Sequence, residues 1–473
     1  MTLVAPSARL VDAATGAVLA GADLTAALSR AATAYAALPS GVVFARSGTT
    51  VEAVLRFAAA FGAGRPVAPL DPGLDPAVLA DFVDRFAPAA VVGLAEGGAG
   101  TQAGDPPKGY RTATDGVLGP IWVRDAEPAE PPHPDLAVLL ATSGSTGDPK
   151  FVRLSRDAVL ANAAAIGTAL RIGRTEVAPT NLPLCYSFGM SVVTSHLAAG
   201  ATVLAVEGGV LAREFWAAVA EYGATSLAGV PHHYEMLHRI RWSPAGYPSL
   251  RTLTQAGGRL RDEIILAFHE KIDAVGGRFH VMWGCTEAAP RMSTLPAGAL
   301  PERVGSVGPA LTGGAFTVLD PDGVETGAPD VVGEVVYRGP NVMMGYAEHA
   351  ADLARGDDQG GVLRTGDLGL VDVDGFVWLR GRLSRFGKVF GIRVNLYDVE
   401  ELVRDRGPVA AVSGPDRVVV FVEGIDAAGA REVAGRLSER LRMHRTGFDV
   451  RDVDRLPRLP NGKIDYRSLE ARV

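Results

Sequence analysis

A polar loop at residues 142–150, TSGSTGDPK, holds the densest group of side chains that could do chemistry. Its glycines allow backbone N–H groups to approach an anion without a Cβ clash. Its hydroxyls can donate hydrogen bonds, and its lysine supplies a full positive charge. The loop therefore predicts a phosphate-binding site. The residues concerned are Thr142, Ser143, Gly144, Ser145, Thr146, Gly147 and Lys150.

Two common phosphate-binding patterns do not fit this loop. A Walker A motif has Gly before its Lys and Ser or Thr after it. Here Pro149 and Phe151 flank Lys150, and the Rossmann GxGxxG pattern is absent from the turn. A flexible polar turn is the alternative interpretation. The packing of hydroxyls, glycines and a cation into nine residues argues against it.

The loop resembles the signature loop of the AMP-forming adenylating enzymes. These include acyl-CoA synthetases, peptide-synthetase adenylation domains and luciferases, and the sequence is most similar to the stand-alone acyl- or aryl-acid CoA ligases. Further motifs follow in the order of that family along almost all of the chain. The resemblance implies that the loop holds the phosphates of ATP and that Lys150 is catalytic.

The segment MWGCTEAAPRMS (282–293) resembles the aromatic-Gly-x-Thr-Glu motif of the family, which usually has Tyr where Trp283 stands. Trp283 offers a π face to adenine, with Gly284 and Cys285 beside it. Thr286 offers a hydroxyl to a phosphate. Glu287 is an oxygen ligand suited to a Mg²⁺ ion that bridges phosphates. The resemblance makes Thr286 and Glu287 catalytic and Glu287 the metal ligand.

Two further segments complete the expected nucleotide site. QAGGRL (255–260) resembles the segment that packs on the other face of adenine. RTGDLG (364–369) and GFVWLRGR (375–382) resemble the segments that contact ribose and phosphate, where an acidic residue can accept both ribose hydroxyls. The residues implied are Gly257, Gly258, Arg259, Asp367 and Arg382. A further family segment, GEVVYRGPNVMMGY (333–346), is interpreted as structural, with glycines that serve turns.

The C-terminal motif LPRLPNGKIDYRSL (456–469) resembles the one that carries the adenylation lysine, which is Lys463 here. A charge on a long stem can reach both a carboxylate and the α-phosphate as negative charge develops. KVFGIRVNLYDVE (388–400) resembles the segment that meets the thiol, with Lys388 and Gly391. The hinge falls at Ser384, where the family usually has Asp or Lys.

The acid pocket is expected around NLPLCYSFGMS (181–191). Tyr186 and Ser187 are its implied lining, with Met282 and His232. The Asp with which peptide-synthetase domains pair an α-ammonium group is not evident, which disfavours an ordinary α-amino acid. The histidines show no metal-ligand spacing. Cys285 is interpreted as a packing residue because no base can be argued for it.

Strand-like and helix-like stretches alternate along the first 300 residues, which predicts parallel sheets in an α/β fold. Examples are strands at 41–46, 65–72 and 89–95 and helices at 50–64 and 75–86, followed by a loop region at 96–135. Short Gly- or Asp-bounded strands after residue 301 predict an antiparallel region. The expected N-terminal core, residues 1–382, has two parallel-type α/β sheet subdomains and a small β-barrel-like region. The resemblance implies that a small, mobile α+β domain with the lysine, residues 383–473, follows.

Composition excludes several classes of protein. Apolar residues make up 47% and charged residues 21%, which suits a globular protein and not a disordered chain. A net charge of −7 without a basic run gives no support for nucleic-acid binding. Cys185 and Cys285 alone cannot build a disulfide framework. No signal peptide is evident and no apolar run reaches ~18 residues, so no membrane span and a cytoplasmic location are expected.

The predicted reaction is ATP-dependent activation of a small carboxylic acid as an acyl-adenylate, with release of pyrophosphate and transfer to a thiol. ATP and Mg²⁺ are the expected cofactors, and CoA or the phosphopantetheine of an acyl carrier protein is the expected acceptor. Amide synthesis, nitrite-dependent diazotisation, a luciferase-like oxidation and a non-catalytic nucleotide-binding regulator remain alternatives. The sequence leaves open the acid, the acceptor and the oligomeric state.

Overall fold

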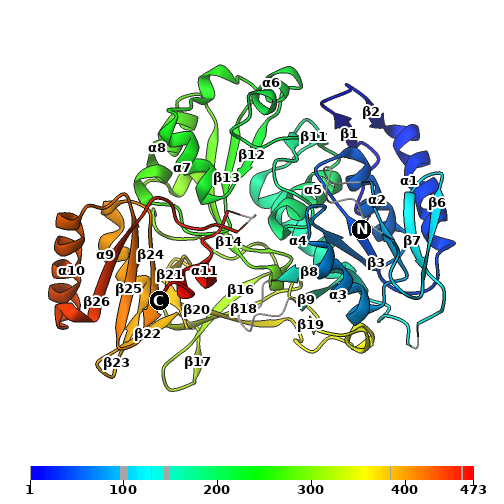
Figure 1. The fold of residues 1–473 in the computed structure, drawn as a ribbon. Helices are drawn as coiled ribbons and strands as arrows, with labels where there is room; N and C mark the ends of the chain where they lie inside the picture. The colour runs from blue at the N-terminus through cyan, green and yellow to red at the C-terminus, as the bar shows by residue number, and fades with distance from the viewer. Residues whose placement is uncertain (1, 96–104, 129, 143–149, 384, 460–461) are drawn as a thin grey trace. The chain divides into compact units, whose positions relative to one another are not determined.

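The computed structural model describes residues 2–95, 105–128, 130–142, 150–383, 385–459 and 462–473 (Figure 1). The chain forms two compact units. The first comprises Met1–Val304, Pro309–Ala315 and Arg338–Leu363. The second comprises Gly305–Gly308, Phe316–Tyr337 and Arg364–Val473. The boundary predicted between residues 382 and 383 lies inside the second unit and stays a prediction.

The largest sheet of the first unit is mixed, in the order β19-β9-β8-β4-β3-β5-β7-β6 within the described residues. Strands β8, β4, β3 and β5 run parallel, and the outer strands pair antiparallel. The parallel strands are short apolar runs that are almost entirely buried, as expected when helices cover both faces. The bounds are β3 Val43–Arg46, β4 Val67–Leu70, β5 Ala90–Val92, β6 Tyr110–Asp115, β7 Gly119–Arg124, β8 Leu136–Thr142, β9 Lys150–Ser155 and β19 Gly345–Ala347.

Strands β6 and β7 correct the loop predicted over residues 96–135. They form an antiparallel hairpin in which Asp115 pairs with Gly119 and the Asp115 carboxylate accepts the backbone N–H groups of Val117 and Leu118. β7 also pairs with β5, which leaves β6 as the edge strand, and it buries Ile121 and Trp122. Asp115, Gly116 and Gly119 lie at the turn of the hairpin, and strand pairing decided the conformation of the segments on either side of it.

Two smaller sheets complete the strands described for the first unit. Their orders are β12-β13-β14-β15 and β10-β11-β1-β2, and each has three parallel strands with one antiparallel edge strand. The bounds are β1 Arg9–Asp12, β2 Val18–Ala20, β10 Val177–Pro179, β11 Thr202–Ala205, β12 Ser226–Gly229, β13 Thr252–Gln255, β14 Arg278–Gly284 and β15 Arg291–Leu295.

The helices of the first unit pack apolar side chains on these sheets, and α2, α3 and α4 begin at polar caps. Thr50 caps α2 and Ser155 caps α4, since each hydroxyl accepts a backbone N–H from the first turn. Helix α3 presents Phe82 and Phe86 to Phe151 of β9, with ring centroids 5.0 and 4.8 Å apart. The bounds are α1 Gly21–Ala36, α2 Val51–Gly62, α3 Pro76–Phe86, α4 Arg156–Leu170, α5 Ser187–Ala198, α6 Arg213–Glu221, α7 Pro231–Arg239, α8 Asp262–Asp273, η1 Pro244–Gly246, η2 Thr286–Ala288, η3 Ala297–Ala299 and η4 Ala350–Ala354.

The second unit contains a sheet in the order β17-β16-β18-β20-β21, in which the antiparallel pairs β16–β17 and β20–β21 confirm the antiparallel prediction. A β22–β23 hairpin and a β24-β25-β26 sheet follow, and α9 and α10 bury Val399, Val403 and Val433 against the latter. The bounds are β16 Ala315–Leu319, β17 Glu325–Thr326, β18 Gly333–Arg338, β20 Val362–Val371, β21 Val377–Arg382, β22 Phe386–Val389, β23 Ile392–Asn395, β24 Val409–Gly414, β25 Arg417–Glu423, β26 Phe448–Val453, α9 Leu396–Val403, α10 Ala427–Leu441, α11 Tyr466–Glu470, η5 Arg404–Arg406 and η6 Arg445–Gly447.

The predicted α/β class, with several sheets that contain parallel strands, is confirmed. Within the described ranges, every helix is too short or too polar to cross a lipid bilayer.

Candidate active site

A cation and a carboxylate from distant parts of the first unit meet through one tyrosine. The Nζ atom of Lys150, at the start of β9, lies 3.6 Å from the ring centroid of Tyr346 in β19. The Tyr346 hydroxyl donates a hydrogen bond of 2.7 Å to Oε1 of Glu287, in η2. The pairing of β9 with β19, in which Val152 faces Tyr346, brings the lysine and the tyrosine together. Two of the predicted catalytic residues therefore lie at one place.

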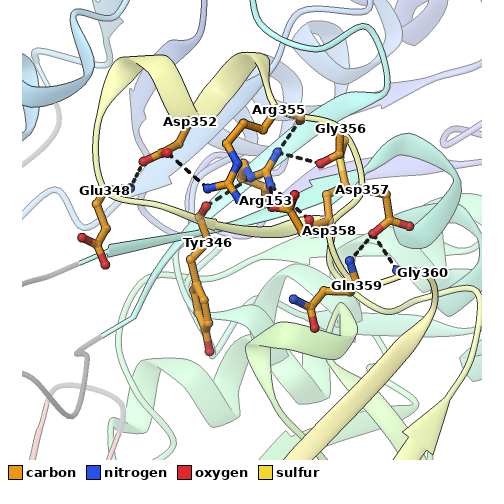
Figure 2. A network of polar contacts seen from close by, with 11 residues as sticks. Arg153, Tyr346, Glu348, Asp352, Arg355, Gly356, Asp357, Asp358, Gln359 and Gly360 are labelled. Atoms are coloured by element: carbon orange, nitrogen blue, oxygen red, sulfur yellow. Dashed lines mark hydrogen bonds and ion pairs between the residues drawn. The ribbon is translucent and has the colours of Figure 1, made fainter.

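A buried arginine holds the backbone around Tyr346 (Figure 2). The Arg153 side chain is fully buried, and its guanidinium donates to the carbonyls of Met344, Tyr346 and Gly356 at 3.0, 3.3 and 3.1 Å. It also donates to the carbonyl of Arg355.

The same guanidinium forms an ion pair of 2.6 Å with Asp358 (Figure 2). Burial lowers the pKa of Arg153, and Asp358 opposes that shift. Neither Tyr346 nor Arg153 was selected from the sequence. The charge of Arg153 inside the otherwise apolar strand KFVRLS was the available signal.

The segment around Glu287 depends on a glycine with no room for a side chain. Strand β14 ends in a bulge at Trp283 and Gly284, where pairing with β15 shifts register. A Cβ on Gly284 would lie 1.9 Å from the carbonyl oxygen of Pro290. The chain then turns into η2, where the Thr286 hydroxyl donates to Ser187 Oγ at 3.4 Å. This contact joins the predicted phosphate-contacting threonine to the predicted acid pocket.

Gly257 and Tyr186 also lie against each other. Gly257 follows β13 with a φ of +89°, and a Cβ there would lie 2.4 Å from the Tyr186 hydroxyl oxygen. Burial raises the pKa of Tyr186 to about 12, so its hydroxyl is protonated at neutral pH. The backbone carbonyl of Gly258 accepts a hydrogen bond of 2.7 Å from Gln255. The neighbouring Arg259 pairs with Asp262 at 3.9 Å.

The remaining predicted residues of the first unit that the structure describes lie on β8, on α7 and beside η2. Thr142 ends β8, and its hydroxyl lies 3.4 Å from the backbone oxygen of Lys150. His232 is half-buried on α7 and lies 4.0 Å from Glu235. Cys285 is partly buried and lies between Gly284 and η2. The loop residues Ser143, Gly144, Ser145, Thr146 and Gly147 lie outside the described residues.

Met282 is buried, and its Sδ atom lies 3.1 Å from Nη1 of Arg291 on the adjacent strand β15. Sequence reasoning missed Arg291. A charged residue in the buried run RMSTL was the signal that could have identified it.

In the second unit, the antiparallel register of β20 and β21 places Asp367 opposite Arg382. Arg382 Nε donates to Asp367 Oδ1 at 2.6 Å. The Asp367 side chain is 9% exposed and the Arg382 side chain 54% exposed, so one end of the arginine reaches solvent. The structure thus joins the two residues that the resemblance assigned to ribose and phosphate.

The predicted C-terminal residues of the second unit lie on a turn or on the β22–β23 hairpin. Lys463 is exposed and follows Gly462, whose φ is +80°. Lys388 is exposed on β22, and Gly391, with a φ of +80°, lies in the turn to β23. Ser384 lies outside the described residues. Its neighbour Leu383 donates its backbone N–H to the carbonyl of Gly366 at 2.8 Å.

Arg385, on the other side of that position, is tied to the C-terminal elements. Its guanidinium donates to both oxygens of Glu400 at 3.1 and 2.7 Å, and it lies 3.8 Å from the ring centroid of Tyr466. The Tyr466 hydroxyl also donates to Glu400 at 3.1 Å. Leu383 and Arg385 therefore bond to different elements, β20 and α9.

No group of three or more His, Cys, Asp or Glu side chains that could hold a metal ion occurs in the described part of the chain. A protein carboxylate that binds Mg²⁺ together with substrate phosphates does not need such a group, because Mg²⁺ keeps several water ligands. Glu287 has the chemistry for that role. The described contacts engage its Oε1 through Tyr346 and show no hydrogen bond to Oε2.

Comparisons with known proteins agree on one family. The family model described as AMP-binding enzyme matches residues 18–347. The chain is 32% identical over 361 residues to sulfoacetate–CoA ligase of Cupriavidus necator, covering 73% of this chain and 69% of that protein. It is 30% identical over 372 residues to indoleacetate–CoA ligase of Aromatoleum aromaticum, covering 74% and 70%. The solved structure of ATP-bound MatB from Rhodopseudomonas palustris aligns over 99% of this chain and 96% of its own, with a TM-score of 0.76 and 24% identity.

Proposed function

This chain belongs to the family of AMP-binding enzymes, and from that membership we propose that it is an AMP-forming acid–thiol ligase. It activates a carboxylic acid with ATP and passes the acyl group to the thiol of CoA. The observation that carries the proposal is the contact series from Lys150 through Tyr346 to Glu287. This series joins the lysine that ends the predicted phosphate loop to the carboxylate that we propose as the Mg²⁺ ligand.

In the first half-reaction, an oxygen of the acid attacks the α-phosphorus of ATP. The bond from that phosphorus to the oxygen bridging the β-phosphate breaks, giving an acyl-adenylate and pyrophosphate. Phosphoryl-type transfer needs positioning and charge neutralisation more than covalent help from the protein. Lys150 supplies positive charge at the loop. Lys463 is the proposed second cation, which stabilises the transition state as charge develops on the α-phosphate.

Glu287 is the residue that would hold Mg²⁺. Its Oε1 is oriented by the Tyr346 hydroxyl, and its Oε2 makes no hydrogen bond with the described residues. One carboxylate with substrate phosphates and water is a common ligand set for this ion. When bound, Mg²⁺ neutralises charge on the triphosphate. Tyr346 keeps the carboxylate in place. Thr286, whose hydroxyl donates to Ser187, borders the proposed acid pocket.

In the second half-reaction, a thiolate attacks the acyl carbon and AMP leaves with its phosphate oxygen. The β22–β23 hairpin, with Lys388 exposed on β22 and Gly391 in its turn, is the proposed approach for the thiol. The names of the relatives support CoA as the acceptor, since both reported relatives are CoA ligases. Their acids, sulfoacetate and indoleacetate, differ in size and charge, so those names do not select an acid. A carrier-protein pantetheine, an amine and nitrite are alternative acceptors for the test to separate.

The test is a pyrophosphate-release assay over a panel of carboxylic acids, with and without CoA, and with products identified by mass spectrometry. We expect acid-dependent release of pyrophosphate, an acyl-adenylate without CoA and an acyl-CoA with it. Glu287→Gln should abolish most of the release, whereas Glu348→Gln, an exposed control near Tyr346, should not. ATP binding without pyrophosphate release for any acid would overturn the proposed function. Amide or diazo products would overturn the thiol acceptor alone.

A further inference from the structure

A small cavity lies inside the first unit between α4, α5 and strands β12 and β13. The space available to the centre of a water molecule is ≈ 20 Å³. That is room for about one or two waters or one compact polar group. The polar side chains that line it include Ser195, His196, Thr254, Glu176 and Arg291. Leu170, Ile172, Val192 and Ala228 complete the lining, so polar and apolar side chains share the cavity.

Arg291 is the buried cation of this cavity, with 2% of its surface exposed. Its Nε atom has no hydrogen-bond partner. Nη1 contacts the sulfur of Met282 at 3.1 Å, and the guanidinium carbon lies 4.6 Å from the ring centroid of Phe188. No carboxylate lies within 4.0 Å of its nitrogens among the residues that the structure describes. The cation is therefore held by soft, uncharged neighbours.

Hydrogen bonds and strand pairing hold the backbone of Arg291 in place. Asn162 Nδ2 donates to the Arg291 carbonyl at 2.7 Å, and the Arg291 N–H donates to Asn162 Oδ1 at 3.3 Å. Strand β15 also pairs Arg291 with Gly284, whose missing Cβ leaves room for the bulge. The structure builds a rigid support for a side chain that its own residues do not neutralise.

Burying a cation without a partner costs free energy, because the cation loses its hydration. An anion beside it can compensate for that loss. Burial lowers the pKa of Arg291 to about 9, so the side chain is still charged at neutral pH. The nearby imidazole of His196 is uncharged there, since burial lowers its pKa to about 4. Glu176 lines the cavity but forms no ion pair with Arg291. Its carboxylate accepts a hydrogen bond from the Thr225 hydroxyl.

Arg291 adjoins the side chains assigned to the acid pocket. Met282 touches its guanidinium, and Phe188, under that guanidinium, meets Tyr186 edge to face with centroids 6.3 Å apart. Ser187, between those two aromatic residues in sequence, contacts Thr286. A substrate whose reacting carboxylate lies near Thr286 would therefore point its other end toward Arg291.

We propose that Arg291 binds a second anionic group of the substrate, so that this enzyme activates a short acid with a negative charge at each end. The assignment rests on the proposed function. The group at Arg291 is a carboxylate or a sulfonate, each of which can accept hydrogen bonds from Nε and the guanidinium nitrogens together. The small cavity limits the acid to a few carbons between its two charged ends.

The test compares acids of equal length that differ only in the second charge. Full-length protein with MgATP is assayed for pyrophosphate release with malonate against propionate and with succinate against butyrate. Monomethyl succinate keeps the shape of the longer diacid and removes one charge. We expect kcat/KM to be at least tenfold higher for each dianion, and the methyl ester to behave as butyrate does.

Arg291→Met should lower kcat/KM for the dianions by 100-fold or more, mostly through KM, and should reverse the order of preference. Arg291→Lys should retain part of the preference, because it keeps the charge. Arg239→Met removes an exposed arginine from α7 and should leave the preference as it is. Glu176→Gln tests the alternative interpretation of the cavity, in which Glu176 is the counter-ion of Arg291. The proposal would be overturned if Glu176→Gln lost the preference for dianions while Arg291→Met kept it.

The outcomes separate this inference from the proposed function. Turnover of monoanionic acids with no preference for dianions overturns the role of Arg291 and leaves the ligase intact. No pyrophosphate release for any acid, of either charge, overturns the ligase. If Arg291→Met folds poorly, the proposal is tested instead by the melting temperature of the unaltered protein, measured with ATP present. Succinate should raise it more than butyrate at equal concentration, and equal shifts would contradict the proposal.

Discussion

The hydroxyl of Tyr346 lies 2.7 Å from Oε1 of Glu287 while the ring of the same tyrosine lies under the amine of Lys150 at 3.6 Å. One side chain thus orients the proposed metal ligand and packs on the proposed phosphate-binding cation. The ring face attracts the ammonium, and the hydroxyl reaches a carboxylate, so each part of the tyrosine has its own partner.

Tyr346→Phe should therefore lower the rate of adenylate formation about tenfold, since it removes one hydrogen bond to a charged group and keeps the ring. The measurement is acid-dependent exchange of pyrophosphate into ATP over a range of Mg²⁺ concentrations. Because the carboxylate loses its orienting bond, the Mg²⁺ concentration for half-maximal exchange should rise. Tyr222→Phe is the control, because Tyr222 is distant in sequence from both Tyr346 and Glu287. An unchanged Mg²⁺ dependence would contradict the orienting role.

Arg153 should stabilise the first unit more than any exposed arginine of the same network. Arg153→Met removes hydrogen bonds to several carbonyls and leaves Asp358 without its buried partner. We expect the free energy of unfolding to fall by about 3 kcal/mol, as for other broken buried pairs.

The matched control is Arg355→Met. The Arg355 side chain is 55% exposed and pairs with Asp352 and Asp358 at 3.4 and 3.0 Å. Its loss should cost under about 1 kcal/mol. Denaturant titration of both variants measures the difference, and equal losses would show that burial of Arg153 adds nothing.

The bulge before Glu287 should tolerate only glycine. Gly284→Ala would place a Cβ against the Pro290 carbonyl, so the backbone must shift. Overpacking of this kind typically costs about 1–3 kcal/mol, and the shift should also lower adenylation. Gly298→Ala meets no atom within 4 Å and serves as the control. Thermal unfolding and pyrophosphate exchange, measured together, check both effects. A stable, fully active Gly284→Ala variant would disprove the constraint.

Lys463 should act in the first half-reaction alone. Lys463→Ala is expected to lower adenylate formation by about 100-fold or more, as removal of a transition-state charge partner does. Transfer to CoA from added acyl-adenylate should be affected far less. Lys108→Ala removes another exposed lysine and should change neither rate. Exchange that is as fast in Lys463→Ala as in the parent protein would rule out the assignment.

Acidification should destabilise the fold through two buried histidines. Burial, the largest cause, lowers the pKa of His196 and of His280 to about 4, below the ordinary value of 6.5. Between those pH values the unfolded chain binds protons that the folded chain does not, so stability is full above pH 6.5 and falls as the pH falls toward 4.

The loss from this effect is up to about 3 kcal/mol for each imidazole. Unfolding free energies measured from pH 7 to 4 should show a smaller slope in His196→Gln than in the parent protein. His444→Gln changes an exposed histidine and should keep the parent slope. Parallel slopes in all three proteins would contradict the predicted titration.

Sequence patterns predicted much of the fold because hydrophobic periodicity and caps act locally. Residues 50–64 and 75–86 were expected as helices, and α2 and α3 occupy Val51–Gly62 and Pro76–Phe86. The loop expected over residues 96–135 was wrong where β6 and β7 pair. The partner strand, which is not visible in the local pattern, provides the hydrogen bonds that make that segment extended.

The site shows the same division between local and long-range information. Residue types predicted a cation in the phosphate loop, because such chemistry depends on the groups themselves. The resemblance to the adenylating family assigned the metal ligand to Glu287 and the catalytic charge to Lys463. Membership of the AMP-binding enzyme family also follows from sequence. The tertiary structure alone decided that Tyr346 joins Lys150 to Glu287 and that Arg291 is buried without an anion. Contacts between segments far apart in the chain are set by sheet pairing and packing, which a local pattern does not contain.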